Sequence, residues 1–144
     1  MKTRVFMIAS LLMLSMIAAA QVVQAQNLVA NIPFEFVMNE ARLPAGEYYV
    51  VHQGYNGAVR LINREDGASA IVLTMPTRAT RRTESKLIFN RYGNNYFLSK
   101  IWSSESATGS QLPKSPREKE LTKVVRIENR GQVTLLARIS STKP

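Results

Sequence analysis

The feature that most constrains the fold of this chain is the alternation of apolar and polar residues along short segments. Near the amino end Ile32, Phe34 and Phe36 are separated by single residues, and near the carboxyl end Val133 and Leu135 are spaced in the same way. Successive side chains of a β-strand point to opposite faces, so this spacing predicts strands that bury one face. The sequence therefore predicts an all-β protein.

Turn signals separate these segments. Proline sets the backbone for the second position of a tight turn, and glycine or asparagine tolerates the left-handed conformations that hairpins need. The signals are Leu43-Pro44-Ala45-Gly46, Asn56-Gly57, Asp66-Gly67, Tyr92-Gly93-Asn94-Asn95 and Arg130-Gly131. Spaced at roughly 8 to 12 residues, they predict a small antiparallel β-sandwich or closed barrel of about eight strands. The pattern suits both architectures equally.

Individual segments carry sharper expectations. Residues 31–37 are predicted to form a strand that either lies at a sheet edge or points the nitrogen of Pro33 outward, because Pro33 has no N–H to offer to a ladder. Residues 68–75 are the most apolar segment and are expected at the centre of the sheet. The arginine-rich residues 77–84 are expected to form an exposed loop, and residues 103–115, rich in Ser and Thr, a long connection.

One short helix is expected before the last hairpin. Ser115-Pro116-Arg117-Glu118 combines a capping serine, a proline suited to the first helical position and a glutamate three residues after the cap. The predicted helix runs from Pro116 to Thr122. Residues 123–129 and 132–140 are then predicted to pair as a hairpin that closes the chain.

The amino end reads as an export signal. Lys2 and Arg4 form a positive head, and an apolar run covers Val5–Ala20. This run is shorter than the roughly 20 apolar residues that span a bilayer, so we expect cleavage rather than an anchor. Cleavage after Ala25 is preferred because a polar stretch follows. Residues 1–25 are therefore expected to be a signal peptide, with no transmembrane segment after cleavage.

Residues 26–144 are expected to form one antiparallel β-domain with a modest core. The chain has no cysteine, so its stability must come from packing, and thiolate zinc sites and lipid attachment to cysteine are excluded. Loss of Lys2 and Arg4 with the leader lowers the formal charge from +9 to +7. A basic exported protein favours an anionic partner, which we expect to be a glycan or lipopolysaccharide rather than nucleic acid.

Few residues suggest catalysis. His52 is the only histidine, and a serine and an acid would have to reach it from elsewhere in the fold. Glu35 and Glu47 could form a carboxylate pair on neighbouring strands, but both are expected to point to solvent. Glu65-Asp66 suits a turn better than a metal site. We expect no enzyme activity, no catalytic residue, no metal and no cofactor.

The strongest binding candidate is the arginine-rich segment. Arg78, Arg81 and Arg82 could grip phosphate or carboxylate groups through bidentate guanidinium contacts, although a solvated loop has the same composition. The aromatic residues near this segment could stack on sugars, but at strand spacing they more often belong to the core. They are Tyr92, Tyr96, Phe97 and Trp102. We expect the arginine-rich segment and residues 103–115 to form the contact surface.

Two motifs near the amino end resemble those of a known group. Ile32-Pro33-Phe34-Glu35-Phe36 is followed, after a polar spacer, by Leu43-Pro44-Ala45-Gly46-Glu47-Tyr48. This pair resembles small exported bacterial proteins of uncharacterised function that begin with a Pro-Phe-x-Phe strand and a Leu-Pro-Ala-Gly-x-Tyr turn. The resemblance covers about twenty residues. It implies export and a β-rich fold, and it brings no catalytic or binding residues with it.

We therefore expect a non-enzymatic envelope or secreted module, periplasmic or extracellular, that binds an anionic partner or packs in an assembly. The alternative is a small hydrolase acting on an envelope polymer. A homo-oligomer is a further expectation, because both sides of residues 47–53 are partly apolar and a second copy could cover one of them.

Overall fold

The computed structural model describes residues 27–54, 56–78 and 84–141. The strands, in chain order, are β1 (Asn27–Ile32), β2 (Phe36–Met38), β3 (Ala41–Leu43), β4 (Gly46–Gln53), β5 (Ala58–Asn63), β6 (Ser69–Leu73), β7 (Met75–Arg78), β8 (Lys86–Tyr92), β9 (Asn95–Trp102), β10 (Thr108–Gln111) and β11 (Arg130–Ser140). The helix α2 (Pro116–Val124) and a short 3-10 turn, η1 (Ile127–Asn129), precede β11. The predicted all-β fold with one helix late in the chain is confirmed.

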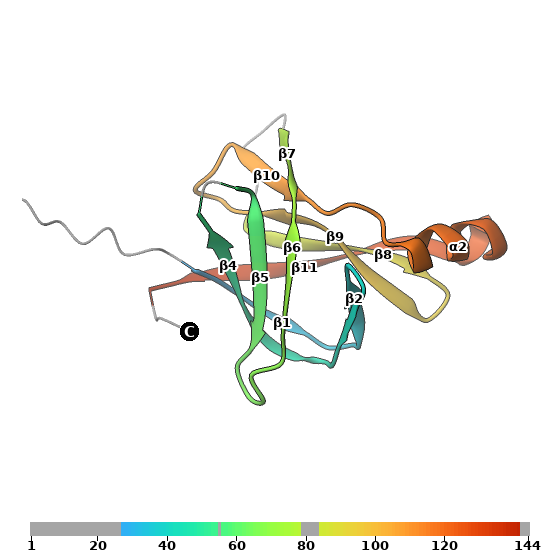
Figure 1. Ribbon diagram of the computed structural model, residues 1–144, viewed down its shortest axis with the longest axis horizontal. Coiled ribbons are helices and arrows are strands. Elements are labelled where there is room, and N and C mark those ends of the chain that lie inside the picture. The colour runs from blue at the N-terminus through green and yellow to red at the C-terminus, as the bar shows by residue number, and fades with distance from the viewer. Residues whose placement is uncertain (1–26, 55, 79–83, 142–144) are drawn as a thin grey trace, which may run out of the picture.

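The strands form a nearly closed barrel (Figure 1). The main path runs β3-β2-β9-β8-β11-β1-β4-β5-β6, and neighbours pair antiparallel except for a parallel contact between Val37 of β2 and Phe97 of β9. Only Thr74 separates β6 from β7, and β7 pairs with β10, which pairs with β9. The sheet thus returns to the strand near its start.

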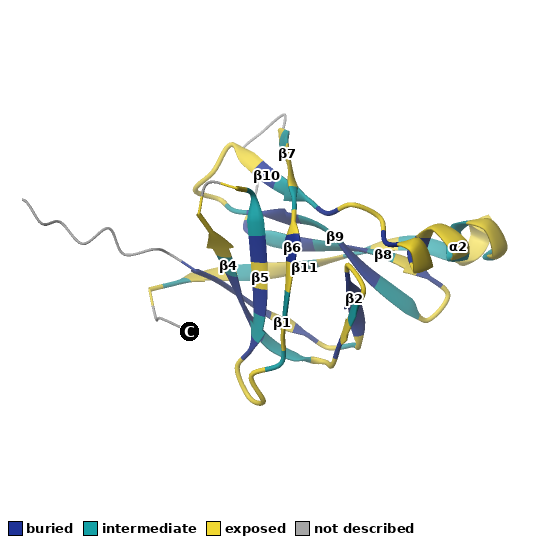
Figure 2. Ribbon diagram, in the orientation of Figure 1, coloured by how far each residue is buried: buried dark blue, intermediate teal, exposed yellow. Residues whose placement is uncertain are grey.

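The core fills the barrel with alternate residues of its strands (Figure 2). The ring of Phe36 makes edge contacts with Tyr48 and Phe89, at centroid distances of 5.3 and 5.5 Å. Burying a large apolar side chain stabilises a fold by about 1.5–3 kcal/mol. The buried Tyr48 hydroxyl donates to the carbonyl of Pro44 at 2.6 Å, which ties the first tight turn to the core. The buried cluster within the described residues includes members from Leu28 of β1 to Leu112, which follows β10.

The single strand expected at residues 31–37 is wrong. The chain leaves β1 after Ile32 and bends through Pro33 and Phe34 before β2 begins. β1 pairs with both β11 and β4, whereas β2 pairs with β3 and β9. A proline interrupts a ladder because it has no N–H. Here the interruption carries the chain from one part of the barrel to another, and Phe34 stacks on Tyr96 at 3.9 Å.

The apolar segment 68–75 is not central. β6 pairs only with β5, and its outward side chains Ile71 and Leu73 are 53% and 66% exposed, while Val72 is buried. A barrel wall has one inner face, so alternate residues of even an apolar strand point outward. Residues 77–78, expected in the arginine-rich loop, belong to β7, which pairs with β10 at residues 108–111, expected in the connection. The remainder of the expected arginine-rich loop, residues 79–83, lies outside the described residues.

The helix begins as predicted and ends later. The Ser115 hydroxyl accepts the backbone N–H of Glu118 at 3.2 Å, and Pro116 occupies the first turn. The strand expected at residues 123–129 is wrong, because α2 continues to Val124 and η1 follows. β11 already has ladders with β8 and β1, so no neighbouring position remains for another strand. Within the described ranges, no helix is long and apolar enough to cross a bilayer.

Candidate functional site

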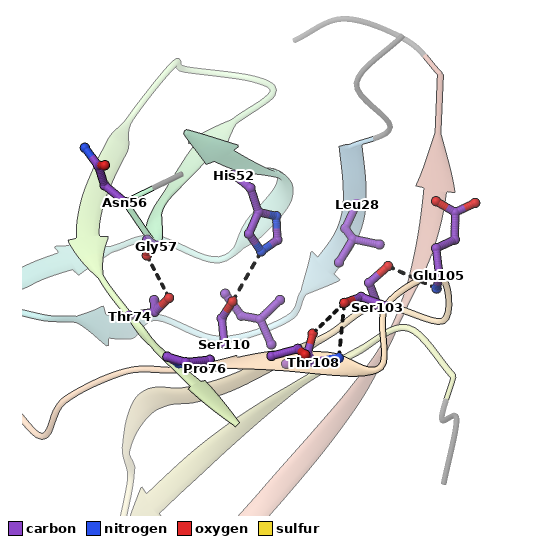
Figure 3. A pocket seen from close by; sticks show the side chains of 13 residues that line it. Leu28, His52, Asn56, Gly57, Thr74, Pro76, Ser103, Glu105, Thr108 and Ser110 are labelled. Atoms are coloured by element: carbon purple, nitrogen blue, oxygen red, sulfur yellow. Dashed lines mark hydrogen bonds between the residues drawn. The ribbon is translucent and has the colours of Figure 1, made fainter. Parts of the chain in front are cut away.

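A hollow of about 560 Å³ lies at one end of the barrel (Figure 3). The start of β1, the end of β4, the junction of β6 with β7, and the chain from the end of β9 into β10 surround it. Leu28 and Ile101 contribute apolar surface, whereas Ser103, Thr108 and Ser110 contribute hydroxyl groups. The mouth of a barrel is a common position for a small-molecule site.

The wall of the hollow between β9 and β10 is shaped by its own hydroxyl groups. The Ser106 hydroxyl accepts the backbone N–H of Thr108 at 3.1 Å and donates to its carbonyl at 2.9 Å. Ser103 accepts the backbone N–H of Glu105 at 3.4 Å. Such local bonds replace the ladder that this segment lacks. The connection expected to be irregular is therefore an organised loop.

Gly109 lets the aromatic ring of Trp102 pack beneath this wall. A Cβ at position 109 would lie 2.5 Å from the Trp102 ring, closer than side chains can pack. Gly57, across the hollow, has a φ of +71°, and a Cβ there would lie 2.8 Å from the carbonyl oxygen of Thr74. Thr74 in turn donates from its hydroxyl to the Gly57 carbonyl at 2.7 Å. Both glycines permit backbone approaches that define the shape of the hollow.

His52 lies at the end of β4, with its Nε2 atom 3.3 Å from the hydroxyl oxygen of Ser110 (Figure 3). The side chain keeps contact with solvent, yet partial burial lowers the pKa of His52 below its ordinary value. Burial therefore favours the neutral form of the imidazole. The two residues are 58 positions apart in the chain, and no sequence signal links them.

The contact between His52 and Ser110 supplies a base and a hydroxyl group, the first two parts of a nucleophilic site. An acid would have to orient the imidazole. Glu105 lies across the hollow from His52 (Figure 3). Among the described residues, the His52 ring forms its hydrogen bond with Ser110. Ser110 also sits in regular ladders opposite Pro76 and Ile101. The contact accordingly ties the end of β4 to β10.

The predicted anion site is described only in part. Arg78 is exposed at the end of β7, directly opposite Thr108 of the hollow's wall. Arg81 and Arg82 lie outside the described residues. The structure thus pairs one of the three candidate arginines with Thr108, a residue that lines the hollow. Residues between 103 and 110, from the other expected contact segment, form part of the lining itself.

The candidate carboxylates are held by arginines on the outer surface. Glu47 contacts the guanidinium groups of Arg64 and Arg138, each at 2.6 Å, and the hydrogen bond from Arg64 is the main reason that the pKa of Glu47 is lowered. Glu35 contacts Arg42 at 2.6 Å. The two carboxylates therefore belong to separate ion pairs, and both point to solvent as expected.

The other candidate residues have structural roles. Asp66 accepts the backbone N–H of Ala68 at 2.8 Å, which is the turn role expected for it. Tyr92, Phe97 and Trp102 are buried, and Tyr96 lies against Phe34, so these rings belong to the packing rather than to a stacking surface. In the ranges that the structure describes, no three His, Asp or Glu side chains gather in a way that could hold a metal ion.

Comparison with protein-family models, curated proteins and solved structures found no significant match. The site is therefore interpreted from its own geometry. One feature of the fold that sequence reasoning missed is the buried carboxylate of Glu118, which accepts Asn90 Nδ2 at 2.9 Å and the Tyr92 hydroxyl at 3.1 Å. Its only sequence signal was its position three residues after the helix cap.

Proposed function

We propose that this protein is an exported, non-enzymatic binding module whose hollow accepts a segment of an anionic glycan. The observation that carries the proposal is the hydroxyl-lined hollow of about 560 Å³, with the exposed Arg78 paired opposite Thr108 of its lining. A cavity of this size suits a ligand of a few sugar rings, since ligand sites commonly measure about 300–1,000 Å³.

The chemistry of the lining favours sugar. Serine and threonine hydroxyls both donate and accept hydrogen bonds, as sugar hydroxyls do. Leu28, Ile101 and Pro76 supply apolar surface for the C–H faces of sugar rings. Arg78, together with the basic character of the whole chain, favours carboxylate, sulfate or phosphate substituents on the sugar.

Export is supported by the amino-terminal signal pattern, with cleavage proposed after Ala25. Expression of the full chain in a bacterium with a secretion pathway tests this point. We expect the protein outside the cytoplasm with Gln26 as its first residue, as read by mass spectrometry. Recovery of the whole chain from the cytoplasm would contradict export without affecting the binding proposal.

Binding is tested by titration calorimetry with a heparin hexasaccharide as the anionic probe and a dextran oligomer as the neutral control. Arg78→Ala should weaken heparin binding by about fivefold or more, and added salt should weaken it further because an exposed contact is screened. Arg60→Ala is the matched control, since Arg60 is an exposed arginine on β5. Absence of heparin binding, or equal loss in both variants, would contradict the proposal.

The alternative function, a small hydrolase, is favoured by one observation, the 3.3 Å contact between His52 and Ser110. An ester probe such as p-nitrophenyl acetate distinguishes the two functions. A binding module should give the same slow turnover in the wild type, His52→Gln and Ser110→Ala. Turnover that falls by two or more orders of magnitude in both variants would establish the hydrolase instead.

A further inference from the structure

The end of α2 and the turn η1 form a projecting tip at one end of the molecule, opposite the start of β1 (Figure 1). Val124 and Ile127 of this tip are 75% and 82% exposed, the highest values among the large apolar side chains that the structure describes as exposed. These two apolar residues lie three positions apart in the chain. A partner that removed both side chains from water would gain favourable free energy from their burial.

The tip is held rigidly in place. The Arg130 guanidinium group donates from Nε to the Val125 carbonyl at 3.0 Å and from Nη2 to the same carbonyl at 2.8 Å, and Nη2 also contacts the Thr122 carbonyl. These bonds satisfy carbonyl groups that the end of a helix leaves without partners. The exposure of Val124 and Ile127 is thus a fixed property of the turn.

The base of the helix is anchored as firmly. The Glu118 carboxylate accepts the Asn90 amide and the Tyr92 hydroxyl within the fold. Leu121 and Val125 pack against Val37, Tyr92 and Phe97. One side of the helix therefore meets the barrel, while Val124 and Ile127 remain outside this contact.

Exposed basic residues lie close to the apolar tip in the chain. Lys119, Lys123 and Arg126 are exposed on α2 and in the turn that follows it. Lys123 contacts Glu120 at 3.1 Å and Arg126 contacts Glu128 at 3.6 Å, with all four side chains largely open to solvent. Exposed pairs of this kind are weak and open readily to other charges. The tip therefore combines exposed basic side chains with the two exposed apolar side chains.

We propose that this tip docks the protein onto an anionic lipid surface. Val124 and Ile127 enter the boundary between headgroups and acyl chains, while Lys119, Lys123 and Arg126 lie at the level of the lipid phosphates. A second copy is a poor occupant because it would oppose cations to cations. A water-soluble glycan is a poor occupant because it offers no apolar phase for the two side chains. An anionic bilayer supplies phosphate groups for the basic side chains and an apolar interior for Val124 and Ile127.

Docking through two apolar residues is shallow and reversible. Neither α2 nor η1 is long enough to lie as an extended amphipathic helix in the interface. Binding should therefore need anionic lipid and should fall as salt screens the basic side chains. The tip lies on a different part of the fold from the hollow, so the glycan and the membrane are separate partners that can bind together.

Co-sedimentation with vesicles tests the proposal, using the chain that begins at Gln26 because the apolar leader would itself bind lipid. Wild-type protein should pellet with vesicles of phosphatidylcholine containing 30% phosphatidylglycerol and remain in solution with phosphatidylcholine alone. Val124→Ser with Ile127→Ser should weaken binding to the anionic vesicles at least tenfold. Lys123→Gln with Arg126→Gln should weaken it at least threefold.

The matched control is Leu73→Ser with Leu136→Ser, which removes two apolar side chains elsewhere on the barrel that are each 66% exposed. This control should bind like the wild type, and all variants should keep the wild-type melting temperature within a few degrees. Absence of wild-type binding to the anionic vesicles overturns the proposal. An equal loss of vesicle binding in the tip and control variants also overturns it, because any exposed apolar side chain would then contribute to binding as much as those of the tip.

Discussion

At the scale of single residues, the shape of the hollow depends on two glycines, which have no side chain, and on one contact between side chains of distant strands. Gly109 has no side chain because the Trp102 ring occupies that space, and Gly57 has none because the Thr74 carbonyl does. His52 and Ser110 meet across 58 residues of sequence. The site is therefore as much a product of close backbone packing as of its polar groups.

Gly109→Ala should destabilise the protein by about 1–3 kcal/mol, because the new methyl group overlaps the Trp102 ring and the barrel wall must shift. Gly131→Ala is the control, since its nearest neighbour would lie 3.6 Å away at ordinary contact distance. Urea unfolding measures both variants. A Gly109→Ala protein as stable as the control would show that the ring moves aside without penalty.

Glu47 should make stability depend on acid. The hydrogen bond from Arg64, with that from Arg138, lowers the pKa of Glu47 below its ordinary value in the folded protein. A carboxyl group with a lowered folded pKa stabilises the protein above its unfolded pKa, and this stabilisation is lost as the pH falls further. Glu47→Gln should therefore reduce the difference in urea midpoint between pH 6 and pH 3. An unchanged difference would assign the acid sensitivity to other groups.

At the scale of elements, the barrel has strongly and weakly held parts. β1 pairs with two long neighbours, β4 and β11, whereas β10 is a short strand whose ladder with β9 covers Ser110 and Gln111. β7 pairs with β10 alone. Local opening is expected where ladders are short and partners few. The wall of the hollow is therefore, with the short strands β2 and β3, one of the weakly held parts of the described sheet.

Hydrogen exchange should follow this division. Amide protons of β7 and β10 should exchange at least tenfold faster than those of β1, β4 and β8, because opening β10 breaks few ladder bonds. Mass spectrometry of pepsin fragments measures the rates at neutral pH. If a saturating concentration of heparin hexasaccharide is added, the β10 fragment should slow most. Uniform protection across all strands would contradict a weak closure at β10.

The elements that sequence reasoning predicted well depend on local chemistry. The Pro44 turn, the Ser115 cap and the glycine turn at residue 57 each involve residues close together in the chain. The wrong predictions concern which strands pair with one another in the sheet. Residues 123–129 have strand-like spacing, yet β8 and β1 already occupy the ladders of β11. Likewise, the spacing of residues 68–75 does not reveal that β6 turns Ile71 and Leu73 outward.

In the candidate site, too, the local features were predictable and the contacts between distant segments were not. Residues 103–115 were expected to be a contact surface because their composition is that of a polar connection, and the structure uses residues 103–110 to line the hollow. The neighbours of that surface, His52 and Leu28, come from strands far away in sequence. Neighbours of that kind depend on the strand order, which alternation alone does not determine.

At the scale of the whole molecule, the strand segment β6–β7 joins two parts of the barrel. Its first half pairs with β5 and its second half with β10, on either side of Thr74. A single described cluster of buried residues extends from Leu28 to Leu112 and fills the barrel. Because the two parts share this core and this strand, neither can unfold fully without exposing the other.

Urea unfolding should therefore show one cooperative transition. Trp102 is the only tryptophan in the chain and is 8% exposed, so its fluorescence reports on the wall beside the hollow. Far-ultraviolet circular dichroism reports on the whole sheet. The two midpoints should coincide within experimental error. A fluorescence transition at clearly lower urea would show that the β10 wall unfolds as a separate unit.

The outward face of β6 and β7 has a consequence for the chain before it is fully folded. From Gly67 to Thr77 the sequence carries no charge, and its strand-forming side chains Ile71, Leu73 and Met75 remain on the surface of the finished barrel. Such a stretch promotes aggregation when its ladders are open, and flanking charges act as gatekeepers. Asp66 and Arg78 occupy those flanking positions, so they oppose aggregation through this uncharged segment while the chain is still unfolded.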